Sequence, residues 1–319
     1  MESQRRKVNV ALLSVISNTT LVILKLAVGL LIGSVSILSE AIHSATDLIA
    51  AVIALFSVKT SGRPPDSKHP FGHGKIENIS GSIEALLIFV AAGWIIFEAT
   101  AKLRHPTPVE NLGWGVGVML FSTLVNIVVS EMLFRVAKET DSVALEADAW
   151  HLRTDVYTSA GVMASLALIW AGERVFPGRH FHWLDPVAAI AVALLIIKAA
   201  YDLTVKSGRD LLDSRLPGQE EKWIIAMIKE HRSTIHGFHD LRTRKAGSFR
   251  FVEFHIKVDP VMTVQDSHRI TDEIAARIKK QFRHVSVTIH TEPCDGNCEG
   301  KCLEGCLLPV KGKIDSKKE

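Results

Sequence analysis

The chain has 319 residues, of which 47% are hydrophobic and 22% are charged, and its mean hydropathy is +0.21. This average is too apolar for an ordinary soluble enzyme and too charged for a bundle of membrane helices alone, so a mixed chain is predicted. The proportions exclude disorder, collagen-like repeats and coiled coil. A scattered net charge of +3 does not favour nucleic acid as a partner.

Six apolar stretches between residues 8 and 206 are long enough to cross a bilayer, which takes roughly 20 residues of helix. They are residues 10–32, 37–58, 79–101, 112–134, 143–170 and 183–205. Six crossings leave both ends of this region on one side of the lipid bilayer. The short charged segment before them has no small-residue cleavage signature, so we expect no removable signal peptide.

Lysine and arginine are unequally distributed between the two sides of these spans. Eleven lie on the side of the N-terminus: Arg5, Arg6, Lys7, Lys59, Arg63, Lys68, Lys75, Arg135, Lys138, Lys206 and Arg209. Four lie on the other side: Lys102, Arg104, Arg174 and Arg179. This excess predicts that both termini are cytoplasmic. The cysteines near the C-terminus would then be reduced, and would act as thiols or metal ligands rather than form disulfides.

The spacing His-x-x-x-Asp occurs in two predicted spans, as His43 and Asp47 and again as His151 and Asp155. Residues i and i+4 share one face of a helix, so each span offers one imidazole and one carboxylate to a common point. Two nitrogens and two oxygens suit a tetrahedral Zn²⁺ site, and protons would compete for the same groups. One copy alone could be a local polar contact between helices, but the repetition favours a metal site.

The loop between residues 61 and 75 places Asp66, His69 and His73 within eight residues of one another. Three such side chains on a short loop can chelate a metal ion. The alternative is an ordinary solvated loop.

The residues after the sixth span predict a helix over 219–231, strands over 239–245 and 248–259, a helix over 264–282 and a strand over 285–291. Alternation in the second strand places Val252 and Phe254 in the core and Phe251 and His255 outside it. The same patterns keep four histidines out of the core: His239, His255, His268 and His290. A bound metal would explain them; scattered surface histidines are the alternative.

The last segment contains all the cysteines, which recur every four residues as Cys294, Cys298, Cys302 and Cys306. Four thiolates could hold Zn²⁺ or Cu⁺, but this is not the spacing of a zinc ribbon, and the intervening glycines suggest flexibility. Metal capture or delivery and an unstructured, redox-labile tail therefore remain open.

Three features together resemble the cation diffusion facilitator family. They are the paired intramembrane motifs, the loop Asp-Ser-Lys-His-Pro-Phe-Gly-His-Gly-Lys-Ile-Glu over residues 66–77, and Gly-Phe-His-Asp-Leu-Arg-Thr-Arg from residue 237. The resemblance covers the chain up to about residue 293 and implies an α-helical membrane protein with a cytoplasmic α+β ferredoxin-like (αββαβ) domain. It implies a six-helix transport domain over 1–207 and a dimerisation and metal-sensing domain over 208–293. The cysteine-rich flexible tail expected over 294–319 departs from the common pattern of the family.

The resemblance also implies roles for individual residues. His43, Asp47, His151 and Asp155 would form the transport site, and a histidine at the first of these positions is similar to zinc-preferring members. Asp66, His69 and His73 would form a second zinc site. Lys75 and Asp213 would join the two domains as a charge interlock. A third zinc site at a homodimer interface would involve His239, Asp240, His255, His268, His290 and Glu292, the last in place of an aspartate.

The sequence therefore predicts a homodimeric efflux transporter of the bacterial inner membrane, not an enzyme, that exports Zn²⁺ in exchange for protons. A membrane-embedded sensor that binds zinc without transporting it is the first alternative. The second is an intramembrane zinc hydrolase, for which Glu40 is the only nearby candidate base; four protein ligands would leave no open position for its water.

Overall fold

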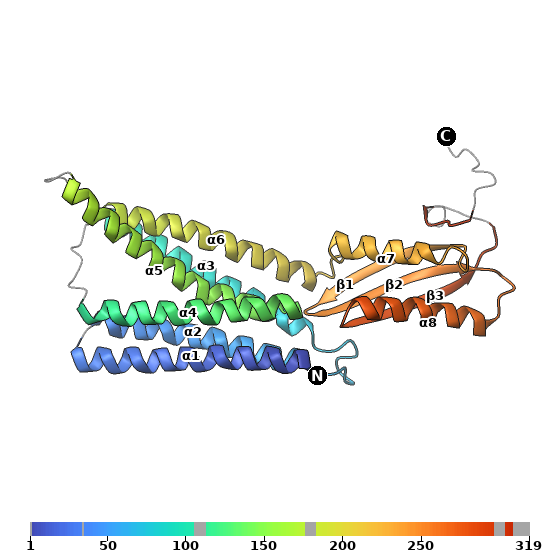
Figure 1. Ribbon diagram of the computed structural model, residues 1–319, viewed down its shortest axis with the longest axis horizontal. Coiled ribbons are helices and arrows are strands. Elements are labelled where there is room, and N and C mark those ends of the chain that lie inside the picture. The colour runs from blue at the N-terminus through green and yellow to red at the C-terminus, as the bar shows by residue number, and fades with distance from the viewer. Residues whose placement is uncertain (1, 34, 105–112, 176–182, 297–303, 309–319) are drawn as a thin grey trace. The chain divides into compact units, whose positions relative to one another are not determined.

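The computed structural model describes residues 2–33, 35–104, 113–175, 183–296 and 304–308, and it divides the chain into two compact units. The first unit is Met1–Leu211 and the second is Leu212–Glu319 (Figure 1). The first is helical, and the second combines helices with one sheet.

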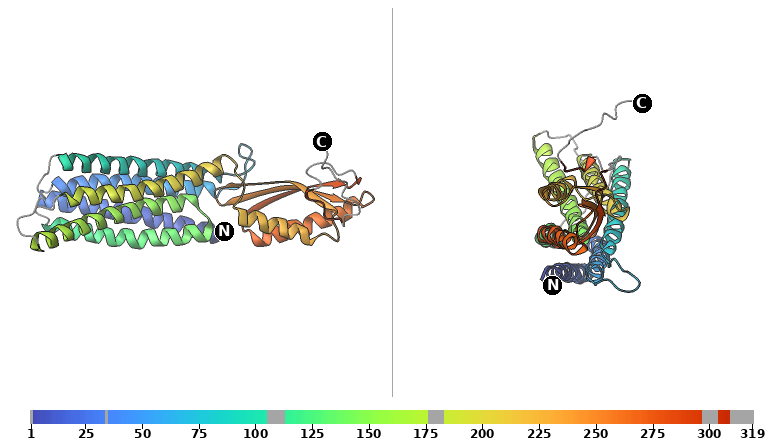
Figure 2. Two further views of the ribbon diagram at one scale, coloured as in Figure 1. Left: turned by 90° about the horizontal axis from the view of Figure 1, so that it is seen from above. Right: turned by 90° about the vertical axis from the view of Figure 1, so that its right-hand side faces the viewer.

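Six long helices form the first unit, and they run side by side along their length (Figure 2). They are α1 (Glu2–Ile32), α2 (Val35–Ser61), α3 (Lys75–Arg104), α4 (Gly113–Thr140), α5 (Val143–Val175) and α6 (Leu184–Leu211). Each predicted span lies within one of them to within a residue. Among the described residues, α1 to α4 and α6 contain stretches long and apolar enough to cross a membrane. α5 is less apolar because it carries Asp148, Arg153 and Asp155.

Hydrogen bonds place the ends of four helices together at one end of the bundle, which we call the proximal end. The Gln4 side chain of α1 donates to the Val58 carbonyl near the end of α2, at 2.6 Å. Lys75, the first residue of α3, donates from Nζ to the carbonyl of Leu211, the last residue of α6, at 3.2 Å. The first helix thus begins where the sixth ends, as expected for six crossings.

Small residues let the helices approach closely around α5, which contacts α2, α3, α4 and α6. Ala85, Ala92, Ala147 and Ala200 are fully buried where α3, α5 and α6 meet. At Gly81, an added Cβ would lie 2.7 Å from the Ser207 hydroxyl. Such close backbone approach is the usual way in which membrane helices pack.

A buried carboxylate, Glu77, joins several helices at the proximal end. It accepts hydrogen bonds from Lys7 Nζ of α1 at 2.9 Å and from the Ser61 hydroxyl of α2 at 2.8 Å. The Ser142 hydroxyl, just before α5, donates to it at 2.6 Å. The side chains of Lys7 and Glu77 are only 3% and 1% exposed, so this ion pair is part of the interior.

The second unit has the predicted order of elements. They are α7 (Gly218–Glu230), β1 (Gly237–Ala246), β2 (Phe249–Val258), α8 (Val264–Gln281) and β3 (Val285–Pro293). The sheet order is β1-β2-β3; β1 and β2 are antiparallel, whereas β3 is parallel to β2 because α8 forms the crossover. The predicted αββαβ arrangement is confirmed.

The core of this unit follows the sequence pattern. Val252 and Phe254 of β2 pack with Ile274 and Ile278 of α8, and all four are buried. Phe251 lies outside this cluster, as the alternation predicts, yet its ring is buried as well. The guanidinium of Arg244 lies 4.1 Å from its ring centroid and covers it on the other face of the sheet.

Residues 304–308 of the predicted flexible tail pair with the free edge of β1. The amide of Phe238 donates to the Gly305 carbonyl at 3.1 Å, and the amide of Leu307 donates to the His236 carbonyl at 2.9 Å. The backbone of Cys306 thus forms an isolated antiparallel β-bridge with that of Gly237. Cys298 and Cys302 lie outside the described residues.

Breaking the buried ion pair at the proximal end should destabilise the bundle. Lys7→Met leaves the Glu77 carboxylate without its cation, which typically costs about 3 kcal/mol or more. Thermal unfolding of the detergent-solubilised protein measures this loss. The control is Arg6→Ala, which removes the half-exposed ion pair with Glu139 and should cost less than about 1 kcal/mol. Equal losses in the two variants would contradict a structural role for the buried pair.

Candidate metal centre

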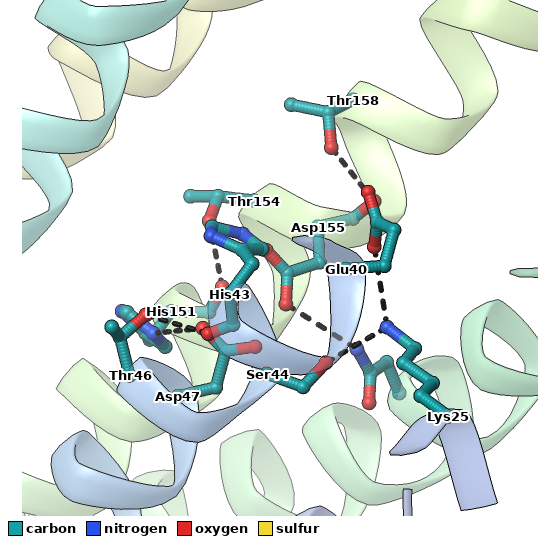
Figure 3. Close-up of polar contacts among 11 residues, drawn as sticks. Lys25, Glu40, His43, Ser44, Thr46, Asp47, His151, Thr154, Asp155 and Thr158 are labelled. Atoms are coloured by element: carbon teal, nitrogen blue, oxygen red, sulfur yellow. Dashed lines mark hydrogen bonds and ion pairs between the residues drawn. The ribbon is translucent and has the colours of Figure 1, made fainter. Parts of the chain in front are cut away.

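The two intramembrane motifs meet where α2 and α5 face each other (Figure 3). His151 Nε2 of α5 lies 3.1 Å from Asp47 Oδ1 of α2. His43 Nε2 of α2 lies 3.7 Å from Asp155 Oδ1 of α5. Each imidazole therefore faces the carboxylate of the other helix rather than the one four residues away on its own helix.

Three of these residues form a compact set of ligand atoms. One ligand atom each from His43, Asp47 and Asp155 lies within 4.8 Å of the other two. His151 stands behind this group, in contact with Asp47, and its Nδ1 atom is buried without a partner among the described residues. The structure thus brings all four predicted side chains together. Three of them form one group of ligand atoms, and His151 adjoins that group through Asp47.

Threonines at matching positions use their hydroxyls within each motif. Thr46 donates to the carbonyl of His43 at 2.6 Å, and Thr154 donates to the carbonyl of His151 at 2.7 Å. These local bonds satisfy the hydroxyls on their own helices. On α4, the Asn126 amide donates to Asp155 Oδ2 at 3.4 Å and orients that carboxylate.

A cavity of about 270 Å³ reaches the front of this group. It is lined by residues of all six helices, including His43, Asp47, Asn126 and Asp155. His43 is exposed to it, whereas Asp47 is almost fully buried. An ion in the cavity could thus reach a histidine and two carboxylates at once.

The loop between α2 and α3, residues 62–74, which we call the proximal loop, also brings its predicted ligands together. Asp66 accepts hydrogen bonds from the amides of Lys68 and His69, at 2.9 and 2.7 Å. The bond from the His69 amide is the largest cause of a lowered pKa for Asp66, so the carboxylate stays ionised. His69 Nδ1 lies 3.2 Å from Oδ1, and His73 Nε2 lies 3.4 Å from Oδ2. These three groups can chelate a metal ion, which stays a prediction.

Three histidines stand side by side across the sheet of the second unit. His239 of β1 is paired in register with His255 of β2, and His255 with His290 of β3. Their neighbouring ring centroids are 5.0 and 4.8 Å apart. Because in-register residues project from the same face of a sheet, three separate segments here offer imidazoles to one place.

Glu292 of β3 is the centre of this cluster. It lies 2.8 Å from His255 Nδ1 and 3.1 Å from His239 Nε2. Lys257 Nζ lies 2.7 Å away and is the main cause of lowering the pKa of Glu292 to about 2; hydrogen bonds from the two histidines add to this effect. The carboxylate is therefore ionised over the physiological range and available to a metal.

Asp240 and His268 are placed differently from each other. A bulge in β1 gives Asp240 a positive φ of 50°, and its carboxylate lies 3.3 Å from His239 Nδ1 at the edge of the cluster. His268 lies on α8, with a side chain that is 74% exposed and 3.5 Å from Asp272. Within one chain, the structure does not bring His268 to the others.

Lys257 is a member of the cluster that sequence reasoning missed. Its position two residues after His255 places both on the same face of β2, and this period of two was the available signal. A lysine was overlooked because it is not a metal ligand, yet it supplies the positive charge beside Glu292.

The remaining predicted residues have local contacts. Lys75 bonds to Leu211 within the first unit, and Asp213 lies 3.3 Å from Arg244 within the second. The charge interlock of Lys75 and Asp213 therefore stays a prediction. The amide of Cys294 donates to the Val258 carbonyl at 2.8 Å, and the thiols of Cys294 and Cys306 are free.

The lowered pKa of Glu292 predicts how the stability of the second unit responds to pH. At pH values above the usual pKa of a glutamate, the ionised Glu292 carboxylate stabilises the folded state. This contribution is lost as the pH falls toward 2, the lowered pKa of Glu292. Glu292→Gln should therefore lower the stability of the sheet by about 1 kcal/mol at pH 7, with a gap that narrows below about pH 4.5. Hydrogen exchange of the β2 and β3 amides measures the gap. A gap independent of pH would contradict the assignment.

Each of the two units matches the model of a known protein family. The model of the cation efflux transmembrane domain matches residues 11–212, and that of the cation efflux protein cytoplasmic domain matches residues 216–294. An uncharacterised transporter of Synechocystis is 35% identical over 272 residues, which is 85% of this chain and 86% of that protein. The cation-efflux pump FieF of Shewanella oneidensis is 31% identical over 280 residues, 88% of this chain and 92% of that protein.

Among solved structures, the metal-bound C-terminal domain of the CzcD transporter from Thermotoga maritima is similar to the second unit. It is 33% identical, with a TM-score of 0.24, and the match covers 26% of this chain and all of that domain. The two family models and the curated relatives are those of cation efflux proteins, which excludes the hydrolase alternative. The chain belongs to the cation diffusion facilitator family, whose members are cation efflux transporters of membranes and not enzymes.

Proposed function

We propose that the protein exports Zn²⁺ from the cytosol in exchange for protons, as a homodimer that alternates between inward-open and outward-open states. The observation that carries the proposal is the crosswise arrangement of two histidines and two aspartates between α2 and α5, beside a cavity inside the helical bundle. Placing charged side chains within membrane-spanning helices costs free energy, and such residues usually mark an ion pathway.

The ligand types favour zinc over the common hard cations. Imidazole nitrogen and carboxylate oxygen together suit Zn²⁺ at tetrahedral geometry. Mg²⁺ and Ca²⁺ prefer oxygen ligands alone, and would leave His43 and His151 unused. The two aspartates carry the charge that a divalent ion neutralises.

The same contacts support coupling to protons. Each histidine nitrogen faces an aspartate oxygen, at 3.1 Å for His151 and Asp47 and at 3.7 Å for His43 and Asp155. A proton can be held between the two atoms of each pair. Zinc needs the same nitrogen and oxygen atoms without protons, so the two kinds of cation compete for one site.

The two ends of the bundle differ in a way that suits alternating access. At the proximal end, Glu77 closes the interior through its contacts with Lys7, Ser61 and Ser142. The cavity instead includes Asp185, at the opposite end of α6. With the termini in the cytoplasm, as the distribution of basic residues favours, this cavity would face the outside, where zinc is released.

The loop and sheet clusters suit a regulatory role. Asp66, His69 and His73 lie in the proximal loop, and the cluster around Glu292 lies in the unit that matches the family's cytoplasmic domain. Cytosolic zinc bound at these places would report the concentration of the transported ion, with the cytoplasmic domain as the dimer contact.

Removing one carboxylate of the intramembrane site should abolish transport without unfolding the protein. Asp155→Ala deletes a ligand and half of the site's negative charge, so Zn²⁺ flux into proteoliposomes should fall by at least about a hundredfold. Size-exclusion chromatography should still show the dimer. The control is Glu131→Gln, which alters an exposed carboxylate paired with Arg153 and should keep its flux. Unchanged flux in Asp155→Ala would remove this residue from the mechanism.

The same vesicles separate a transporter from a sensor. In vesicles whose cytoplasmic face points outward, a lumen more acidic than the medium distinguishes the two, because only a proton-coupled exporter converts the outward movement of protons into zinc uptake. Zinc binding without flux, with or without the gradient, would favour the sensor.

A further inference from the structure

A lysine shares the cavity with the intramembrane site. Lys25 of α1 extends its ammonium toward α2, where Nζ lies 3.3 Å from Glu40 Oε2 and donates to the Ser44 hydroxyl at 2.8 Å (Figure 3). Among the residues that the structure describes, it is the single lysine or arginine lining the cavity that His43, Asp47 and Asp155 also line.

The contacts of Lys25 follow the same face of α2 as the metal ligands. Glu40 and Ser44 are four residues apart, as are His43 and Asp47, so the two pairs lie on adjoining rows of one helix face. At 1.5 Å per residue, Ser44 is about 4.5 Å from Asp47 along the axis, and Glu40 is about 10 Å away. Glu40 therefore holds the ammonium on the side away from Asp47.

A free ammonium in this cavity would oppose zinc binding. Asp47 and Asp155 supply the negative charge for the dication, and a lysine paired with either would occupy an oxygen and add a like charge beside the ion. The lysine stem is flexible and long enough to move between neighbouring carboxylates. In this structure the ammonium is held by its hydrogen bond to the Ser44 hydroxyl and by its ion pair with Glu40, which is the one charged partner of the two.

We propose that Glu40 is a positioning residue that restrains Lys25, so that the lysine does not neutralise the carboxylates of the intramembrane metal site. The inference rests on the proposed function insofar as that site binds zinc. Lys25 and Glu40 together keep the total charge of the cavity low, while the restraint leaves Asp47 and Asp155 free for a mobile cation. Without it, the chain's own ammonium would act as a tethered competitor of the substrate.

A double-mutant cycle that removes the charges of Glu40 and Lys25 tests this restraint in the full-length protein in detergent. The readout is the part of the Zn²⁺ binding isotherm that Asp155→Ala abolishes, which separates the intramembrane site from the loop and sheet clusters. Glu40→Gln should weaken this binding about tenfold because it frees the ammonium. Lys25→Met combined with Glu40→Gln should restore it to within about threefold of the wild type.

Glu98→Gln is the matched control. It removes the same charge from the same cavity, but Glu98 is paired with Lys102 at 3.4 Å and not with Lys25, so its effect should stay below about threefold. Equal weakening by Glu98→Gln and Glu40→Gln would overturn the proposal, because it would indicate a general field effect. A double variant as weak as Glu40→Gln would also overturn it, since Glu40 would then act without Lys25.

Lys25→Met alone gives an independent check if Glu40→Gln does not yield a folded dimer. Removal of the restrained cation should leave zinc binding equal to or tighter than that of the wild type, and weaker binding would contradict the restraint. Because the readout is binding, the inference can fail while transport persists. Absent transport would in turn refute the proposed function and leave the binding comparison valid.

Discussion

Charge buried within the helical bundle has to be compensated, and three ion pairs between helices meet this need. An ionised carboxylate in a low-dielectric interior is stable only beside a cation, a proton or a metal ion. Glu77 lies beside Lys7 and Asp47 beside His151, and the buried ammonium of Lys25 lies beside Glu40. Each pair joins two different helices, so these contacts tie the helices together as well as balance the charge.

The kind of cation changes along the bundle, and the change matters for function. At the proximal end and beside the cavity the partners of the carboxylates are lysines. Between them the partners are histidines, whose ring nitrogens can bind either a proton or a metal ion. Under the proposed function, the histidine–aspartate pairs between α2 and α5 are the ones at which a proton would be exchanged for a metal ion. The lysine pairs on either side would hold the helices during this exchange.

Local pattern predicted the elements and the candidate ligands, whereas contacts across helices and strands needed the structure. Periodicity was sufficient for the six helices and the αββαβ order because hydrophobic spacing reports which face is buried. The repeated His-x-x-x-Asp placed each pair on one face, but it could not show that His43 faces Asp155 of the other helix. Alternation assigned Phe251 to the face away from the core, but it could not show that a long arginine covers its ring.

The ionic partners were harder to predict than the ligands themselves. Lys25 and Glu40 are fifteen residues apart on different helices, and no sequence period links them. His268 had the same off-core position as the other histidines, yet only residues in register across the sheet come together. Ligand type was thus visible in the sequence, and the charge balance around the ligands was not.

The central claim is that a divalent ion binds between α2 and α5. A structure of the zinc-loaded dimer, with anomalous scattering recorded at the zinc absorption edge, tests it directly. The account predicts an ion at about 2.0 to 2.2 Å from ligand atoms of His43, Asp47, His151 and Asp155. Zinc found at the loop and sheet clusters, with none between these two helices, would contradict it.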